Sequence, residues 1–115
     1  SKLALKKYPN IRMAGQVTGC EGYVESASMG LLAGLFCAIP EIPLPPAETA
    51  IGSMLRHITV EAIDEVYQPM NINFGLFPPV NALNEKGKKI KGAEHKKLYT
   101  ERAKKALENW ISYTK

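Results

Sequence analysis

The chain has 115 residues and carries 15 Lys or Arg against 11 Asp or Glu, which gives a formal net charge of +4 at pH 7. Its 45% hydrophobic and 23% charged residues are ordinary for a globular protein and exclude wholesale disorder. The most apolar run, residues 29–39, is too short to span a membrane, and Lys6 and Lys7 interrupt any signal-peptide pattern. We therefore expect a small cytoplasmic domain, or a piece of a larger protein, with no membrane segment.

In chain order, the first predicted elements are a strand, a loop and a helix. The run 11–14 is β-compatible, and the loop 15–22 contains three glycines. Apolar residues at helical spacing then predict a helix over 23–38. This helix carries little charge, so we expect most of its faces to be buried. Its expected core stripe is Val24, Ala27, Leu31, Leu35 and Ala38, widened by Leu32 and Phe36.

The second half of the chain begins with a proline-rich connector at 39–46, which cannot be helical. A second helix is predicted over 47–57, and the stretch 59–67 is ambiguous. Apolar and polar residues alternate over 68–80, which indicates an extended segment. A final amphipathic helix is predicted over 93–113, and its apolar face is expected to hold Tyr99, Ala103, Ala106, Leu107 and Trp110. The expected fold class is therefore mostly α with a short strand segment.

The glycine-rich loop offers the first candidate site. A strand, a glycine-rich loop and a helix N-terminus together form an anion-binding geometry, because the first-turn N–H groups lack partners within the helix. However, the glycines stand at 15, 19 and 22, which is not the GxGxxG spacing of a dinucleotide fold. From the residues alone, a ligand-facing loop and a structural turn remain equal alternatives.

Neither cysteine forms a recognisable metal or redox motif, because no CxxC is present and both histidines lie far away in sequence. We expect both thiols to be reduced, Cys37 to be a core residue, and no metal to bind. Cys20 lies in the glycine loop near a helix N-terminus, where a thiol can become nucleophilic. No histidine lies beside it to act as a base, so no catalytic residue is assigned.

Two further stretches could bind ligands. The amides of Asn71 and Asn73 could read a heteroaromatic ring, and the alternative is that they cap turns or satisfy backbone groups. The stretch 86–105 holds nine of the fifteen basic residues, a pattern that suits nucleic-acid phosphates or simply a solvated helix face. The candidate phosphate contacts are Arg56, Lys88, Lys89, Lys91, Lys96 and Lys97.

Three ordered motifs resemble one enzyme family. AGQVTGCEGYVESASMGLLAG, PPAETAIGSMLRHIT and QPMNINFGLFPP are similar to successive blocks of the folate-dependent, FAD-containing tRNA (uracil-5-)-methyltransferases, and the lysine-rich C-terminal helix with Trp110 also fits. The resemblance covers residues 8–112. The tRNA wobble-uridine modification flavoproteins share the first motif but not QPMNINFG, and they are the alternative family.

The resemblance implies an enzyme that forms 5-methyluridine in the T-loop of tRNA. Methylenetetrahydrofolate supplies the carbon, and FAD, reduced by NAD(P)H, supplies the electrons. Family members are about four times as long as this chain, and their dinucleotide motif and catalytic cysteines lie upstream of the region matched. We therefore expect the C-terminal portion of an α/β, glutathione-reductase-like FAD-binding fold, inactive without its N-terminal portion.

The resemblance also implies a division of the chain and a set of cofactor contacts. Residues 1–38 would close the FAD-binding domain, 39–46 would be the connector, and 47–115 would be a C-terminal helical region. Where the family has a small aliphatic residue, this chain has Cys20. The residues implied to face the flavin or folate are Gly15, Gln16, Val17, Gly22, Tyr23, Val24, Asn71 and Asn73.

Two other functions remain open from sequence. The chain could be a stand-alone tRNA-binding or nucleic-acid-binding module that uses its basic C-terminal helix. It could also be an oligomerisation module, because apolar surface left without a partner favours association between copies.

Overall fold

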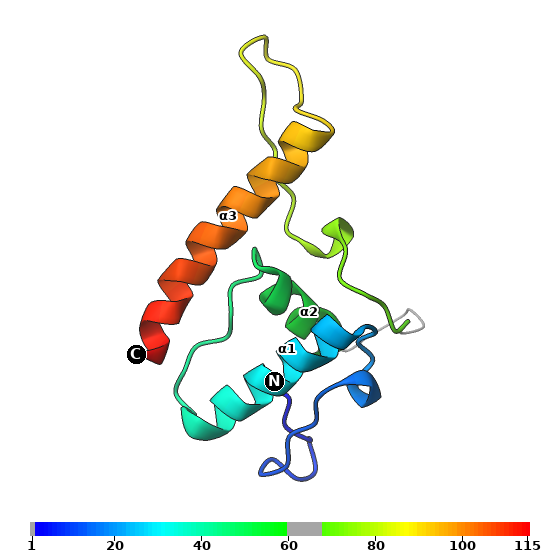
Figure 1. Cartoon of the computed structure of the whole chain (residues 1–115), viewed down its shortest axis with the longest axis vertical. Coiled ribbons are helices and arrows are strands. Elements are labelled where there is room, and N and C mark those ends of the chain that lie inside the picture. Colours follow the sequence, from blue (N-terminus) through cyan, green and yellow to red (C-terminus); the bar gives the residue numbers. More distant parts are fainter. Residues whose placement is uncertain (1, 60–67) are drawn as a thin grey trace.

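The computed structural model describes residues 2–59 and 68–115 as a largely helical chain (Figure 1). Within those two ranges no β-sheet is present. The long helix lies along one side, and the two shorter helices cross beside it (Figure 1). The helices are α1 (Tyr23–Ala38), α2 (Ala50–Thr59) and α3 (Ala93–Ile111), and the 3-10 turns are η1 (Gln16–Thr18), η2 (Phe74–Leu76) and η3 (Ser112–Thr114).

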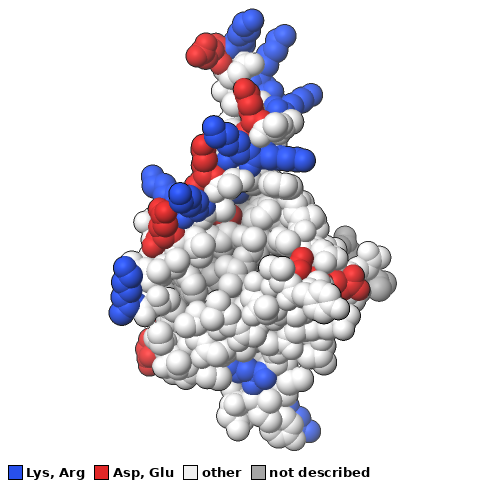
Figure 2. All heavy atoms as spheres, in the orientation of Figure 1, with Lys and Arg blue, Asp and Glu red and all other residues white. Residues whose placement is uncertain are grey.

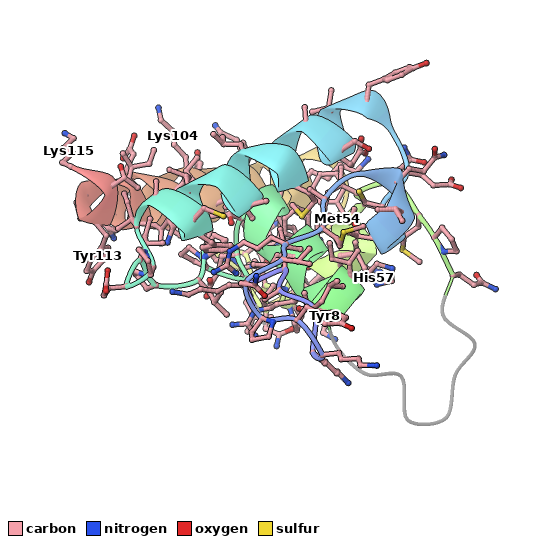
Figure 3. All side chains as sticks on the ribbon, turned by 90° about the horizontal axis from the view of Figure 1, so that it is seen from below. Tyr8, Met54, His57, Lys104, Tyr113 and Lys115 are labelled. Atoms are coloured by element: carbon pink, nitrogen blue, oxygen red, sulfur yellow. The ribbon has the colours of Figure 1, made fainter. Side chains whose placement is uncertain are left out.

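Helix α1 has the predicted bounds, but it buries only part of the predicted stripe. Met29, Leu32 and Phe36, spaced three and four residues apart, are fully buried and pack into the core with Met54 and Leu55 of α2. In Figure 3, Met54 lies beneath α1.

The expected α1 stripe was right at Leu32 and Phe36 but wrong at Val24 and Leu31, and the expectation that most of this helix is buried was wrong. Val24 is 77% exposed and Leu31 is 61% exposed. Cys37, expected in the core, is also exposed. Small and apolar residues occupy nearly every turn of α1, so its sequence pattern does not single out one face, and the packing of α2 decides which face is buried.

The predicted strand at 11–14 is also wrong. Ala4 and Arg12 form an isolated antiparallel bridge, flanked by hydrogen bonds from Leu5 N to Ile11 O and from Met13 N to Leu3 O. Because no further strand pairs with this hairpin among the described residues, its backbone does not extend into a sheet.

Helix α2 begins three residues later than predicted because Thr49 caps it. The Thr49 Oγ1 accepts a hydrogen bond from Gly52 N at 3.0 Å, as expected of an N-cap threonine. The proline connector then passes so close to the helix that a Cβ on Gly52 would lie 1.9 Å from Pro46 O. Ile42 of the connector, 2% exposed, enters the core.

Helix α3 packs along the connector and the extended segment. Trp110 is 6% exposed, and its Nε1–H donates to Pro43 O at 2.8 Å. Two turns earlier, the Arg102 guanidinium donates to Pro78 O at 2.5 Å and to Pro79 O at 3.4 Å. The face predicted to be apolar is therefore the face that packs.

The segment 68–80 is extended as predicted, apart from η2, where Asn73 caps a single turn. The ambiguous stretch 59–67 lies outside the described residues except for Thr59, which ends α2. No helix in the described part of the chain is long and apolar enough to cross a membrane.

Candidate functional site

The glycine loop forms a tight, self-bonded turn. Thr18 donates to Gly15 O from both its backbone N, at 2.9 Å, and its Oγ1, at 2.6 Å. Gly15 has a φ of 83°, and a Cβ built on it would meet nothing within 4 Å. The space beside its backbone is therefore open, and a flat group could approach there without a side chain in the way.

Seven of the eight predicted cofactor contacts, all except Gly15, are exposed to solvent. Gln16 is exposed on η1, and its neighbour Val17 is 72% exposed. Tyr23, which opens α1, is 97% exposed, and Val24 is 77% exposed. Val17, Tyr23 and Val24 are large apolar side chains, so they form an exposed apolar surface that no described residue of the chain covers.

On the other side of the loop, Gly22 lies against Glu25 and Asn71. A Cβ on Gly22 would lie 2.1 Å from Glu25 Oε2 and 2.7 Å from Asn71 Nδ2. The Glu25 Oε1 accepts from Ile72 N at 3.1 Å, and the Asn71 Nδ2 donates to Glu21 O at 3.0 Å. Any residue with a Cβ would clash here, so glycine is needed at this position. The side chains of Glu25 and Asn71 occupy the space beside Gly22, so this space is not open to a ligand.

We name this set of contacts among Glu21, Gly22, Glu25, Asn71 and Ile72 the Glu25 clip. The backbone N–H groups of Glu25 itself and of Ile72, and then the Asn71 amide, hold the pKa of the Glu25 carboxyl below its ordinary value of 4.5. A carboxylate in the first turn also interacts favourably with the helix dipole. The α1 N-terminus therefore already has a negative partner.

The amides of Asn71 and Asn73 both make hydrogen bonds within the chain. The Asn73 Oδ1 accepts from Gly75 N at 2.9 Å, and its Nδ2 donates to Asn71 O at 3.3 Å. These are the turn-capping and backbone contacts that the sequence left open as the alternative. A ligand role for either residue stays a prediction.

Cys20 is fully buried inside the loop. Its Sγ donates to Gly15 O at 3.3 Å, and Thr18 and Ser26 hydroxyls lie 3.8 and 3.9 Å away. The thiol thus helps to hold the turn together. Within the described residues no group of three or more His, Cys, Asp or Glu side chains could hold a metal ion.

The basic residues form a second surface. In Figure 2, Lys and Arg gather over α3 and the turn that precedes it, with Asp and Glu among them, and most of the rest of this face is uncharged. Lys104 points away from the protein in Figure 3. Arg56 is exposed on α2 and belongs to neither α3 nor this turn. The candidates on the basic surface are Lys88, Lys89, Lys91, Lys96 and Lys97, all exposed.

Three residues that are not among the predicted candidate contacts, His95, Tyr99 and Arg102, help to build this surface. The His95 Nε2 lies 3.0 Å from Val80 O, and the rings of His95 and Tyr99 meet edge to face at 5.0 Å. Arg102 lies over the Tyr99 ring, 5.2 Å from its centroid. His95, Tyr99 and Arg102 are spaced four and three residues apart, which could have indicated that they share one face of α3. Their partners in the extended segment could not be predicted from sequence.

The chain is similar to proteins described as methylenetetrahydrofolate–tRNA-(uracil-5-)-methyltransferase TrmFO. The relative from Paramagnetospirillum magneticum is 55% identical over 114 residues, and that from Zymomonas mobilis is 54% identical over 114 residues. Each match covers 96% of this chain. The chain is a homologue of one part of the TrmFO proteins. The resemblance drawn from the three motifs is therefore confirmed.

The chain spans about a quarter of the length of these TrmFO relatives. It covers 26% of the Paramagnetospirillum protein and 25% of a relative from Cereibacter sphaeroides that is 51% identical over 116 residues. A family model described as glucose inhibited division protein A also matches residues 1–40, which include the glycine loop and α1.

Proposed function

We propose that this chain supplies one wall of the flavin site in an FAD-dependent enzyme that methylates uridine at C5 in tRNA. The observation that supports this most strongly is the open, exposed surface at Gly15, Gln16, Val17, Tyr23 and Val24, in a segment homologous to TrmFO. In this proposal the chain is part of an α/β, glutathione-reductase-like domain whose remainder lies outside it.

The residues fit a flavin on one side of the loop only. The open backbone at Gly15 leaves room for a flat ring, whereas the space at Gly22 is occupied by Glu25 and Asn71. Bound FAD, once reduced, would supply the electrons that turn the methylene group of methylenetetrahydrofolate into a methyl group. This chain's own contribution would be to offer the backbone of Gly15, Gln16 and Val17 and the exposed Tyr23 and Val24 as a surface against the ring.

The position of Glu25 changes one part of this proposal. The sequence predicted an anion-binding geometry at the start of α1, but the Glu25 carboxylate already lies at that N-terminus. The role that the structure supports for Gly22 is therefore to let Glu25 and Asn71 approach. Contact with the cofactor falls mainly to Gly15, Gln16 and Val17.

The relatives favour this enzyme over the wobble-uridine alternative. The TrmFO matches run over 114 residues and so include most of the QPMNINFG block, which the wobble-uridine enzymes were expected to lack. The basic surface on α3 is then a proposed contact for tRNA phosphates.

A complementation assay tests the proposal. The chain would be mixed with the non-overlapping part of the Paramagnetospirillum TrmFO protein, and methylenetetrahydrofolate-dependent 5-methyluridine formation in tRNA would be measured with NADH and with NADPH. The proposal predicts activity only in the mixture. If both parts fold and associate but the mixture forms no 5-methyluridine, the enzyme proposal is wrong for this chain.

A stand-alone RNA-binding module is the second candidate, favoured by the exposed lysines around α3. It predicts that the chain alone binds tRNA with a steep salt dependence, and that adding the other TrmFO part does not strengthen that binding.

A further inference from the structure

Beside the N-terminal half of α3 lies a groove of about 390 Å³ that combines aromatic, amide and basic groups. One wall is the extended segment 79–82, and another is formed by residues 89–92. The floor comes from α3. The polar and aromatic side chains that line the groove include Asn81, Lys89, Lys91, His95 and Tyr99.

The groove is held in shape by hydrogen bonds on both walls. On one side, His95 and Tyr99 fix the backbone of Val80: the His95 Nε2–H donates to Val80 O at 3.0 Å, and Val80 N donates to the Tyr99 hydroxyl at 3.4 Å. Because both rings are tied to the same residue and meet at 5.0 Å, their positions are set before any ligand arrives.

The other wall is a hairpin closed by Asn84. Ile90 N donates to Ala82 O at 3.1 Å, and the Asn84 Oδ1 accepts from Lys86 N and Lys88 N at 3.0 and 2.9 Å. These hydrogen bonds fix the backbone of the turn that precedes Lys89 and Lys91. Both lysines therefore lie at a defined position along the edge of the groove.

The groups in the groove match the parts of a nucleotide. Unpaired bases in RNA are recognised by stacking on aromatic or imidazole rings and by hydrogen bonds to their edges, while lysines neutralise the phosphate. His95 provides the ring for stacking. The Tyr99 ring already contacts Phe74, Phe77 and Arg102, so it adds only the part that lines the groove. The exposed Asn81 amide offers a donor and an acceptor. The volume is near the lower end of the range for ligand pockets, which suits one nucleotide.

We propose that this groove binds a single unpaired nucleotide of RNA, with its base against His95 and Tyr99, its edge read by Asn81 and its phosphate at Lys89 and Lys91. The inference rests on the proposed action on tRNA, and it adds a base-binding element to what would otherwise be a purely electrostatic surface.

The test uses the 115-residue chain and two probes, uridine 5′-monophosphate and inorganic phosphate. Amide NMR spectra recorded during titration should show shifts at 79–82 and 89–99 with the nucleotide that phosphate alone does not produce. Asn81→Ala should weaken nucleotide binding about fivefold or more, the low end of what one base contact contributes. Asn109→Ala, a change at an exposed asparagine outside the groove, should leave it unchanged.

A parallel titration with tRNA separates this inference from the proposed function. Lys91→Ala should reduce the slope of log affinity against log salt by about one. Lys7→Ala, a charge-matched change at an exposed lysine outside the basic surface, should leave the slope unchanged. If tRNA binds but Asn81→Ala has no effect and phosphate shifts the same amides as the nucleotide, the groove proposal is overturned and the RNA-binding surface stands. If tRNA does not bind and the nucleotide shifts nothing, both are overturned.

Discussion

The backbone N–H of Ile72 donates to Glu25 Oε1 at 3.1 Å and thereby joins the start of α1 to a segment 47 residues further along the chain. Beside it, Glu21 N donates to Met70 O at 3.0 Å. The loop proposed to face the flavin and the QPMNINFG block are therefore one structural unit.

The Glu25 carboxyl should make the stability of the chain depend on pH. Its pKa is lowered in the folded chain, so the stabilisation is complete above about pH 4.5, its ordinary value, and is lost as the pH falls through the lower folded pKa. Thermal unfolding followed by circular dichroism should show a smaller loss of stability on acidification in Glu25→Gln than in the wild type. Glu108→Gln, an exposed acid on α3, should behave like the wild type. Equal acid sensitivity in Glu25→Gln and the wild type would show that the ionised Glu25 carboxylate does not stabilise the folded chain.

Gly22→Ala should destabilise the chain more than Gly87→Ala does, because both variants pay the cost of a strained positive φ, about 1–3 kcal/mol, and only Gly22→Ala also disrupts the Glu25 clip. The φ of Gly22 is 103°, and a Cβ there would displace Glu25 and Asn71. Urea unfolding gives the free-energy change. The matched control is Gly87→Ala, which also has a positive φ of 70° but open space around it. If both variants lose the same free energy, backbone strain alone explains the effect and contact with the clip is not needed.

Gly30→Ala should instead stabilise the chain by about 0.5–1 kcal/mol. Gly30 lies inside α1, and a Cβ built there meets nothing within 4 Å, so alanine gains helix propensity without a clash. Urea unfolding again measures the change. A loss of stability would mean that another group already occupies the exposed side of α1 in solution, for example a second copy of the chain.

Trp110 should be the largest single contributor to the packing of α3. Trp110→Ala should cost about 3–5 kcal/mol, because a buried indole is removed. Trp110→Phe keeps much of the packing and should cost less, although it leaves Pro43 O without its donor. Circular dichroism is the appropriate probe, since Trp110 is the only tryptophan. A larger loss in the phenylalanine variant than in the alanine variant would contradict this ranking.

Much of the helical framework could be predicted from sequence, because helix spacing and breakers are local signals. The proline-rich connector that contains Pro40 predicted the end of α1. The helical spacing of apolar residues predicted the face of α3 that contains Trp110. What failed depends on distant partners. The buried face of α1 is chosen by Met54 and Leu55, and the 11–14 run lacks a neighbouring strand among the described residues.

The candidate site was predictable only in part for the same reason. The glycines marked the loop, and the lysines marked the basic surface. Glu25 stands three residues after Gly22, which is the spacing of a capping box and could have been noticed. Its bond to Ile72, and the contacts of His95 and Tyr99 with Val80, join segments whose proximity no local pattern encodes.

The central claim, that the backbone at Gly15 lies against a flavin, is tested most directly by FAD retention in the reconstituted mixture with the rest of a TrmFO protein. Gly15→Ala should lower FAD retention about tenfold, because a Cβ would fill the space left open for the ring. Gly87→Ala, with a similar positive φ in the hairpin, should retain FAD like the wild type. Equal retention by the Gly15→Ala and wild-type mixtures would contradict the claim.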